Sequence, residues 1–183
     1  NSGEPARYHE FMPMLVDDWG AVFERDDLPF GIVQLAAFRE FKPDLPVEDQ
    51  WPLLREAQSA TAVAMPNVGI VVTTDIGDAR DIHPRNKREV GRRLARWALH
   101  DHYGRENQDH ASPRIVACEA VVPPRTDGDA TIEGFRLEVE NAMDGLRTRD
   151  GKSPDGFAVQ GPSGKWHWAE ARFGEDGRSV IVW

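Results

Sequence analysis

The chain has 183 residues, of which 40% are hydrophobic and 29% are charged, and its net charge at pH 7 is -9. These proportions are typical of a folded globular protein and argue against a disordered chain. The acidic balance argues against a nucleic-acid partner or an acidic membrane surface, because both require a basic surface. No apolar run approaches the length of a membrane span, and the single cysteine, Cys118, excludes an internal disulfide.

The first part of the chain is expected to alternate helices and strands. Apolar residues recur every three or four positions over residues 8–23, which predicts an amphipathic helix with a kink or a fresh start at Pro13. The further elements are expected to be a buried strand over 30–38, a helix over 51–64, a strand over 69–74 and a helix with Pro84 in its first turn. This order predicts α/β units of a doubly wound sheet with parallel strands.

The character of the sequence changes after residue 103, beyond which no helical periodicity is found. Short strands are expected over residues 115–122, 131–140, 156–161, 165–173 and 179–183, with a bulge at Gly134. Cys118 lies in one of them and is interpreted as a buried small hydrophobic residue. We therefore expect two domains, residues 1–110 and a small antiparallel β-sandwich-like domain of residues 111–183.

The segment between the strand 69–74 and the following helix carries the residues whose side chains are most suited to catalysis. It brings Asp75, Asp78, Asp81 and His83 into nine residues. In open α/β sheets ligands bind at the carboxyl ends of the strands, and an imidazole oriented by a carboxylate is a common general base. The alternative is a structural histidine that caps the next helix. Asp81 or Asp78 can orient His83, and we prefer Asp81, whose alternative role is a loop carboxylate or a helix cap.

The sequence of this segment, TTDIGDARDIHPRNKREVGRRLA over residues 73–95, resembles the histidine block of the sialate O-acetylesterases, which are carbohydrate esterases of the SGNH-hydrolase type. Further similar segments follow in the order of that family: residues 28–36, 54–58, 64–67, 145–152, 156–158 and 165–169. The family carries its nucleophilic serine in a block that precedes anything found here. The chain is therefore expected to be a C-terminal portion, with residues 1–110 forming the end of the esterase domain.

This resemblance implies a serine esterase that acts on O-acetylated sugars or glycans with His83 as its base and without a metal or another cofactor. It also implies an oxyanion-hole role for Asn1, and it implies secretion or a periplasmic location, although no signal region is found in the chain. Gln34, the one polar residue of its strand, is a candidate for substrate binding or a hydrogen-bonded core amide. One departure is that the family usually shows Asp-x-x-His, whereas Arg80 stands three residues before His83.

A second interpretation is a non-catalytic carbohydrate-binding or interaction module. Trp166 and Trp168 project to one side of an expected strand and are able to stack on sugar rings or to fill the core of the β domain. An enzyme requires the loop of His83 to form part of a pocket, whereas a lectin-like module requires exposed tryptophans. The basic residues of the helix that follows His83 are interpreted as its solvated face. Neither the particular sugar nor the oligomeric state follows from the sequence.

Overall fold

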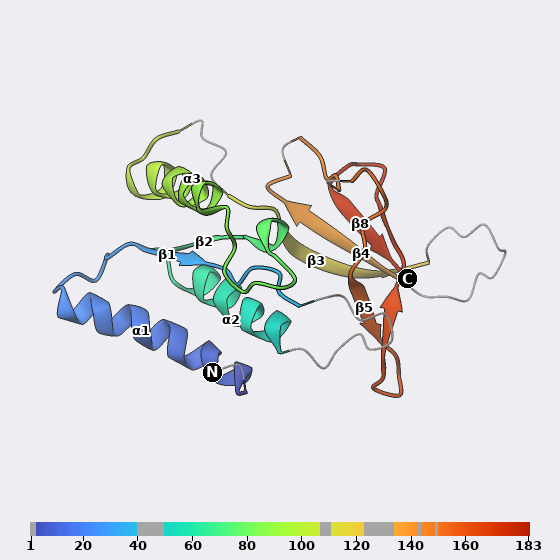
Figure 1. Cartoon of the computed structure of the whole chain (residues 1–183), viewed down its shortest axis with the longest axis horizontal. Coiled ribbons are helices and arrows are strands. Elements are labelled where there is room, and N and C mark those ends of the chain that lie inside the picture. Colours follow the sequence, from blue (N-terminus) through green and yellow to red (C-terminus); the bar gives the residue numbers. More distant parts are fainter. Residues whose placement is uncertain (1–2, 40–49, 107–110, 123–133, 143, 149) are drawn as a thin grey trace. The chain divides into compact units, whose positions relative to one another are not determined.

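The computed structural model describes residues 3–39, 50–106, 111–122, 134–142, 144–148 and 150–183. These residues form two compact units, of which the first ends at Ser112 and the second extends from Pro113 to Trp183. Figure 1 shows helices around a pair of strands in the first unit and antiparallel strands in the second. The expectation of a mixed α/β protein is thus confirmed.

The first unit contains three α-helices and two strands among its described residues. In chain order the elements are the 3-10 helix η1 (Pro5–Arg7), α1 (Tyr8–Val22), β1 (Phe30–Val33), α2 (Trp51–Ala64), β2 (Val68–Val71), the 3-10 helix η2 (Thr74–Ile76), α3 (Lys87–Trp97) and the π-helix η3 (Ala98–His102). The helix expected over residues 51–64 has those bounds. Its buried residues share one helical face, and they are Trp51, Leu54, Ala57 and Thr61.

The two strands pair in parallel, with Phe30 opposite Val68 and Val33 opposite Val71. Helices cover both faces of the pair, with α3 on one face and α1 and α2 on the other (Figure 1). On the α1 face, Val16 packs against Ile32 of β1 and Val68 of β2. Because successive strand residues point to opposite faces, the neighbouring glycines of both strands face α3.

The outer side of α1 remains apolar and exposed. Val16 is its one buried residue, whereas Phe11, Leu15 and Trp19 are 42–49% exposed. These three residues follow at intervals of four and therefore share one face of the helix. Pro13 lies inside α1, which continues through it from Tyr8 to Val22.

The strand expected over residues 30–38 is shorter than predicted, because side chains of α2 replace the strand partner after Gln34, whose amide is the last to donate to β2. The backbone amide of Leu35 donates to Oε1 of Gln58 at 3.0 Å. The carbonyl oxygen of Ala36 accepts from the indole of Trp51 at 2.8 Å and from Arg55 at 3.1 Å. The backbone polar groups of this apolar segment are thus satisfied without continuation of the sheet.

The helix expected to have Pro84 in its first turn begins at Lys87 instead. Asn86 is its N-cap, and its side-chain oxygen accepts from the backbone amide of Glu89 at 3.1 Å. A side-chain cap of this kind satisfies one of the free amides at a helix start and fixes where the helix begins. Pro84 therefore belongs to the loop that precedes α3.

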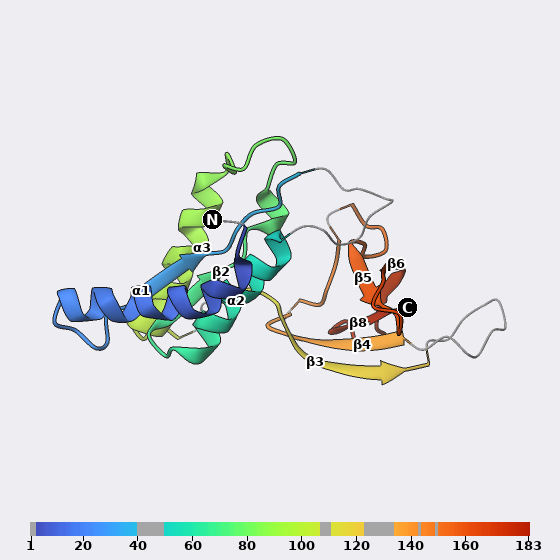
Figure 2. The same ribbon diagram turned by 90° about the horizontal axis from the view of Figure 1, so that it is seen from below.

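The second unit contains only β-strands as regular elements among its described residues. They are β3 (Arg114–Val121), β4 (Gly134–Glu140), β5 (Phe157–Gln160), β6 (Trp166–Ala169), β7 (Ala171–Phe173) and β8 (Ser179–Val182). Four of them form an antiparallel sheet in the order β3-β4-β8-β7, and β5 pairs with β6 (Figure 2). The buried core of the second unit contains Ala171, Val180 and Val182.

Three expectations for this unit are wrong in detail. The strand expected over residues 165–173 is divided into β6 and β7 at Glu170, which exchanges two backbone hydrogen bonds with Trp183 at 2.9 and 3.0 Å. The bulge predicted at Gly134 is found on the neighbouring strand, between Ile115 and Ala117, while Gly134 pairs regularly with Val121. Cys118 is exposed rather than buried. Residues 131–133 of an expected strand lie outside the described residues.

The contact between the paired glycines and α3 leads to a stability prediction. A Cβ atom at Gly69 would lie 1.9 Å from Nε1 of Trp97, so Gly69→Ala forces the indole out of its position. Overpacking of this kind destabilises by about 1–3 kcal/mol. Gly91→Ala is the matched control, because a Cβ atom there would have no atom within 4 Å and alanine favours the helix by about 1 kcal/mol. Urea unfolding should show opposite signs for the two variants, and an unchanged stability of Gly69→Ala would contradict this packing.

Candidate active site

The candidate site is the loop of residues 77–86, here called the His83 loop, which connects η2 with α3. It lies against the segment that follows β1. The backbone amide of Arg39 donates to the carbonyl oxygen of Ala79 at 2.9 Å, and a Cβ atom at Gly77 would lie 2.2 Å from the carbonyl oxygen of Ala37. Glycine is therefore required at residue 77. The segments that follow the parallel strands β1 and β2 thus meet at the same edge of the sheet.

The two aspartates of the loop fold their carboxylates back onto the backbone. An oxygen of Asp78 accepts from the amide of Arg80, and an oxygen of Asp81 accepts from the amide of His83, both at 2.9 Å. The amide of Asp81 also donates to the carbonyl oxygen of Asp78 at 3.3 Å. These are two consecutive Asx turns, in which each carboxylate fixes the residue two positions later.

Asp81 and His83 are also close through their side chains. Oδ1 of Asp81 lies 3.4 Å from Nδ1 of His83, and the side chain of His83 is 82% exposed. The pKa of Asp81 is lowered, first by the hydrogen bond from the backbone amide of His83 and also by the charge of the imidazole. Asp81 is therefore an ionised carboxylate beside Nδ1 of the imidazole.

The two candidate carboxylates have different partners. Asp81 has a carboxylate oxygen near the imidazole of His83, whereas an oxygen of Asp78 holds the backbone amide of Arg80. This arrangement favours Asp81 as the partner of His83, and the catalytic roles of all three residues remain predictions. Among the described residues no group of histidine, cysteine or acidic side chains is arranged to hold a metal ion.

A guanidinium group that the sequence analysis assigned to a solvated face connects this region. Arg93 of α3 donates to both carboxylate oxygens of Asp75 at 2.7 Å each and to Oε1 of Glu89 at 3.0 Å. It also donates to the carbonyl oxygen of Val72, directly after β2. The interpretation as a solvated residue is thus wrong for Arg93. The spacing of four residues from Glu89 was the available signal, because such residues meet on a helix.

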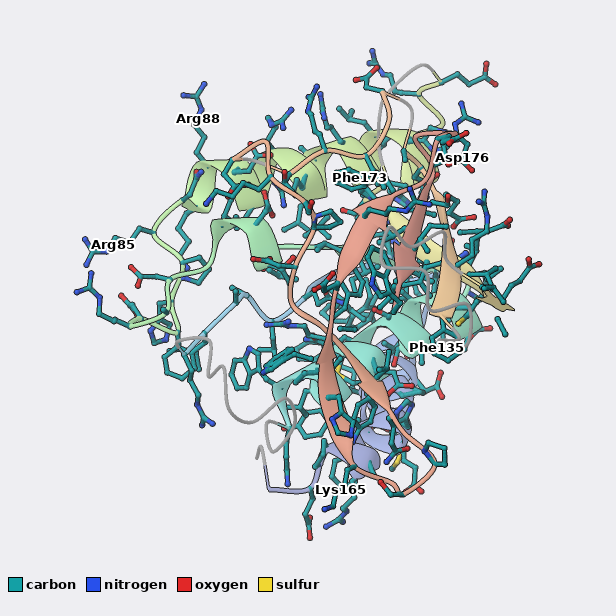
Figure 3. The ribbon with its side chains drawn as sticks, turned by 90° about the vertical axis from the view of Figure 1, so that its right-hand side faces the viewer. Arg85, Arg88, Phe135, Lys165, Phe173 and Asp176 are labelled. Atoms are coloured by element: carbon teal, nitrogen blue, oxygen red, sulfur yellow. The ribbon has the colours of Figure 1, made fainter. Side chains whose placement is uncertain are left out.

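Other basic residues of this region do face solvent, as expected. Arg85 and Arg88 are exposed, and Figure 3 shows both side chains extending away from the loop and from α3. Arg92 is half exposed and pairs with Glu89 at 2.7 Å. Hydrogen bonds from Arg92 and Arg93 lower the pKa of Glu89 from 4.5 to about 2.

Gln34 lies at the end of β1 and is 8% exposed. Its side-chain amide donates to Oγ of Ser59 at 2.9 Å and more weakly to the carbonyl oxygen of Arg55 at 3.4 Å, so it is directed toward α2. This is the environment of a hydrogen-bonded core amide, and a contact with substrate remains a prediction. Asn1 lies outside the described residues.

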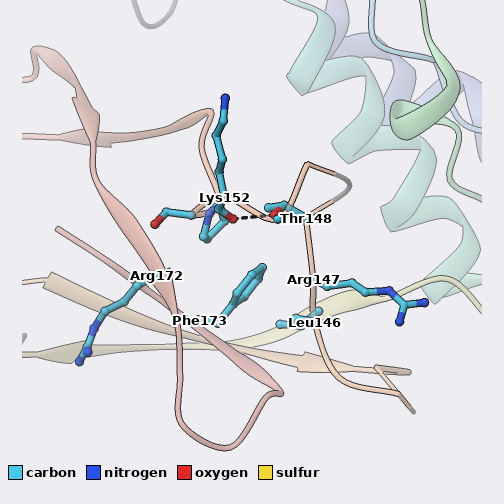
Figure 4. Close-up of a pocket in the computed structure, with 9 residues that line it drawn as sticks. Leu146, Arg147, Thr148, Lys152, Arg172 and Phe173 are labelled. Atoms are coloured by element: carbon cyan, nitrogen blue, oxygen red, sulfur yellow. Dashed lines mark hydrogen bonds between the residues drawn. The ribbon is translucent and has the colours of Figure 1, made fainter.

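A separate pocket of about 360 Å³ lies in the second unit, between the loop that follows β4 and strand β7. The ring of Phe173 points into it, and Oγ1 of Thr148 donates to the carbonyl oxygen of Lys152 on the opposite side, whereas the charged ends of Arg147 and Arg172 point away (Figure 4).

Trp166 on β6 is 42% exposed, while Trp168 is partly buried. No described helix is long and apolar enough to cross a membrane.

Comparisons with known proteins relate this architecture to esterases. No family model matches the chain. A carbohydrate acetylesterase from Xanthomonas citri superposes with a TM-score of 0.77 and 34% identity, over 96% of this chain and 37% of that one. Sialate O-acetylesterases from Homo sapiens and Pongo abelii are 32% identical over 123 residues, which covers 58% of this chain and 23% of theirs.

Over nearly its full length the chain thus shares the fold of part of a carbohydrate acetylesterase. The chain is similar to the sialate O-acetylesterases over part of their length, which confirms the resemblance of its motifs to that family. The chain spans less than a quarter of the length of these curated relatives, since the match covers 23% of each.

The depressed pKa of Glu89 predicts how the attachment of α3 responds to acid. Because the folded-state pKa of about 2 lies below the ordinary 4.5, the ion pairs of Glu89 stabilise the fold above pH 4.5 and are lost as the pH falls toward 2. Glu89→Gln should therefore lower the melting temperature at neutral pH, with a difference from wild type that shrinks in acid. Glu10→Gln, in the first turn of α1, controls for the loss of a carboxylate. A difference that grows in acid would contradict the assignment.

Proposed function

We propose that the protein is a carbohydrate O-acetylesterase that removes acetyl groups from sugar hydroxyls by a Ser-His-Asp mechanism. The observation that carries the proposal is the pairing of Asp81 with Nδ1 of His83 in the loop that follows β2. The similarity to a carbohydrate acetylesterase and to two sialate O-acetylesterases supports it. The substrate is an O-acetylated sugar or glycan, and no metal or cofactor takes part in the proposed steps.

In the proposed mechanism His83 relays a proton in each of two steps, first from the serine and then from water. Nε2 of His83 accepts the proton of a serine hydroxyl while the serine oxygen attacks the acetyl carbonyl carbon, and it then donates this proton to the departing sugar oxygen. A water molecule then attacks the carbonyl carbon of the acetyl-serine while Nε2 takes one of its protons, and Nε2 returns this proton to the serine oxygen as the ester bond breaks and acetate leaves. Asp81 remains ionised and keeps the Nδ1 proton of His83 in place.

The remaining parts of the proposed site come from outside the His83 loop. The serine is proposed to lie upstream of residues 1–183, as the family resemblance implies. Asn1 is proposed to donate to the oxyanion, and Gln34 is retained as a substrate-binding candidate. The buried amide of Gln34 fits this last role only if it exchanges its bond with Ser59 for one with the sugar.

The domain division is part of the proposal. Residues 1–110 are proposed to be the C-terminal part of an SGNH-type esterase domain with a doubly wound sheet, and residues 111–183 a β-sandwich-like domain. The parallel pair of β1 and β2 with helices on both faces supports this. The exposed apolar face of α1 supports it as well, because soluble domains rarely expose contiguous apolar side chains.

A non-catalytic carbohydrate-binding module is the second candidate, favoured by the exposure of Trp166 at 42% and of the His83 side chain at 82%. Trp168, its neighbour on the same side of β6, is partly buried. Sugar binding that survives loss of His83 but is abolished by Trp166→Ala would support a binding module. Acetyl release that depends on His83 would support the esterase.

The test of the proposed function is His83→Ala in the intact enzyme that contains residues 1–183. Loss of the general base should lower kcat for acetyl release from an O-acetylated sugar by about 10³-fold or more, because serine cannot be activated without it. His9→Ala, in the first turn of α1, is the matched histidine control and should retain activity. Retention of activity by His83→Ala would exclude the proposed mechanism.

The choice between the two aspartates gives a second prediction. Asp81→Asn should keep the fold and KM while lowering kcat by about two to four orders of magnitude, because an amide no longer fixes the imidazole tautomer. Asp78→Asn should have a much smaller effect, limited to a loop contribution of about 1 kcal/mol from its hydrogen bond with Arg80. Turnover of both variants on the same acetylated sugar decides between them, and a larger loss at Asp78 would reverse the assignment.

A further inference from the structure

The side chain of Arg93 joins the chain segments on both sides of the His83 loop. Before the loop it donates to the carbonyl oxygen of Val72 and to both carboxylate oxygens of Asp75. After the loop it donates to Glu89, whose backbone amide is held by the capping residue Asn86. A single planar group thus connects the end of β2, the helix η2 and the first turn of α3.

We propose that Arg93 is a positioning residue, which holds His83 in place by clamping the two ends of the loop that carries it. The proposal rests on the proposed function, in which His83 is the proton-transferring residue. Arg93 itself is assigned no contact with substrate or with reacting atoms.

The environment of Arg93 makes these contacts stronger than ordinary surface ion pairs. Its side chain is 22% exposed, that of Glu89 is 21% exposed and that of Asp75 is 45% exposed, and Asp75 is bound through two parallel hydrogen bonds. Exposed ion pairs contribute little, whereas a bidentate and partly buried pair keeps its geometry. The pKa of Arg93 is raised, first by its hydrogen bonds with Asp75.

Clamping both ends matters because the interior of the loop is fixed mainly by short-range contacts. Asp78 holds Arg80 and Asp81 holds His83, both two residues away, whereas Ala79 is bound to Arg39 of the segment after β1. The two Asx turns set the local shape of the loop but not its position relative to the sheet. That position depends on the contact of Gly77 with Ala37, on the hydrogen bond between Ala79 and Arg39, and on the clamp. A displacement of about 1 Å at a catalytic group is able to cost about 10²-fold in rate.

Arg93→Lys is the diagnostic substitution, because lysine keeps the charge but lacks the planar fork that reaches Asp75 and Glu89 together. Arg92→Lys is the matched control. Arg92 lies one position earlier on α3 and also pairs with Glu89, but half of its side chain is exposed. The two variants therefore share the chemistry of the change, and both weaken the binding of an arginine to Glu89, through two hydrogen bonds for Arg92 and one for Arg93.

The first measurement is backbone hydrogen exchange on the intact enzyme that contains residues 1–183, which does not depend on activity. Arg93→Lys should accelerate exchange at the amides of Arg80 and His83 at least 10-fold relative to amides of α2, while Arg92→Lys leaves this ratio unchanged. A clamp predicts this local pattern. Uniform acceleration across α2 and the loop would show that Arg93 contributes to general stability and not to the loop in particular. No change in either region would show that Arg93 stabilises neither. Each result would overturn the inference.

The second measurement is the kinetics of the intact enzyme that contains this chain. Arg93→Lys should lower kcat about 10- to 100-fold with KM changed less than about 3-fold, since the substrate contacts remain. In an Asp75→Asn background the same substitution should have a smaller effect, because the clamp is already broken. An undiminished kcat for Arg93→Lys, or full additivity with Asp75→Asn, would contradict the proposal.

These experiments separate the clamp from the proposed function. If His83→Ala retains activity, the esterase mechanism fails, and hydrogen exchange in Arg93→Lys still decides whether the loop is clamped. If His83→Ala is inactive while Arg93→Lys behaves as Arg92→Lys in exchange and in kcat, the mechanism holds and the positioning role is excluded.

Discussion

The close approach of α3 to the two parallel strands is the constraint on which the first unit depends. Gly31 and Gly69 are opposite each other in the strand register, and Cβ atoms there would lie 2.9 Å from Leu94 and 1.9 Å from Trp97. Two paired glycines thus make room for the side chains of one helix. Because α3 is held this close to the strands, the guanidinium group of Arg93 reaches the carbonyl oxygen of Val72 and the carboxylate of Asp75.

From this constraint the position of the candidate site follows. With α3 fixed against the sheet and its start fixed by Asn86, the ends of the His83 loop are both anchored. The middle of the loop meets the segment after β1, where Arg39 binds Ala79. Residue 39 has a φ of 74°, a left-handed conformation that is uncommon for arginine and consistent with a tightly specified backbone.

The sequence was informative where the decisive interactions are local. The bounds of α2 were predicted because its apolar face repeats along one helix and Pro52 suits a first turn. Three features were not predicted. The end of β1 and the contact of Arg93 with Asp75 depend on partners distant in sequence, and the start of α3 depends on a cap at Asn86 that competes with Pro84. The apolar residues after Val33 looked like strand, yet Gln58 and Arg55, about twenty positions away, bind their backbone. Periodicity carries no information about such contacts.

The departure of this chain from the Asp-x-x-His spacing has a geometric explanation. In an Asx turn an aspartate side chain bends back to the amide two residues later, so residue 83 is brought to the carboxylate of Asp81 by the backbone itself. The same oxygen, Oδ1, accepts the amide hydrogen of His83 at 2.9 Å and lies 3.4 Å from its Nδ1. A two-residue spacing therefore places carboxylate and imidazole together, with one oxygen shared between backbone and ring. The contact between Asp81 and the ring is then weaker than in a dedicated pair. In the proposed mechanism the position of His83 therefore depends more on the anchoring of the loop by Arg93.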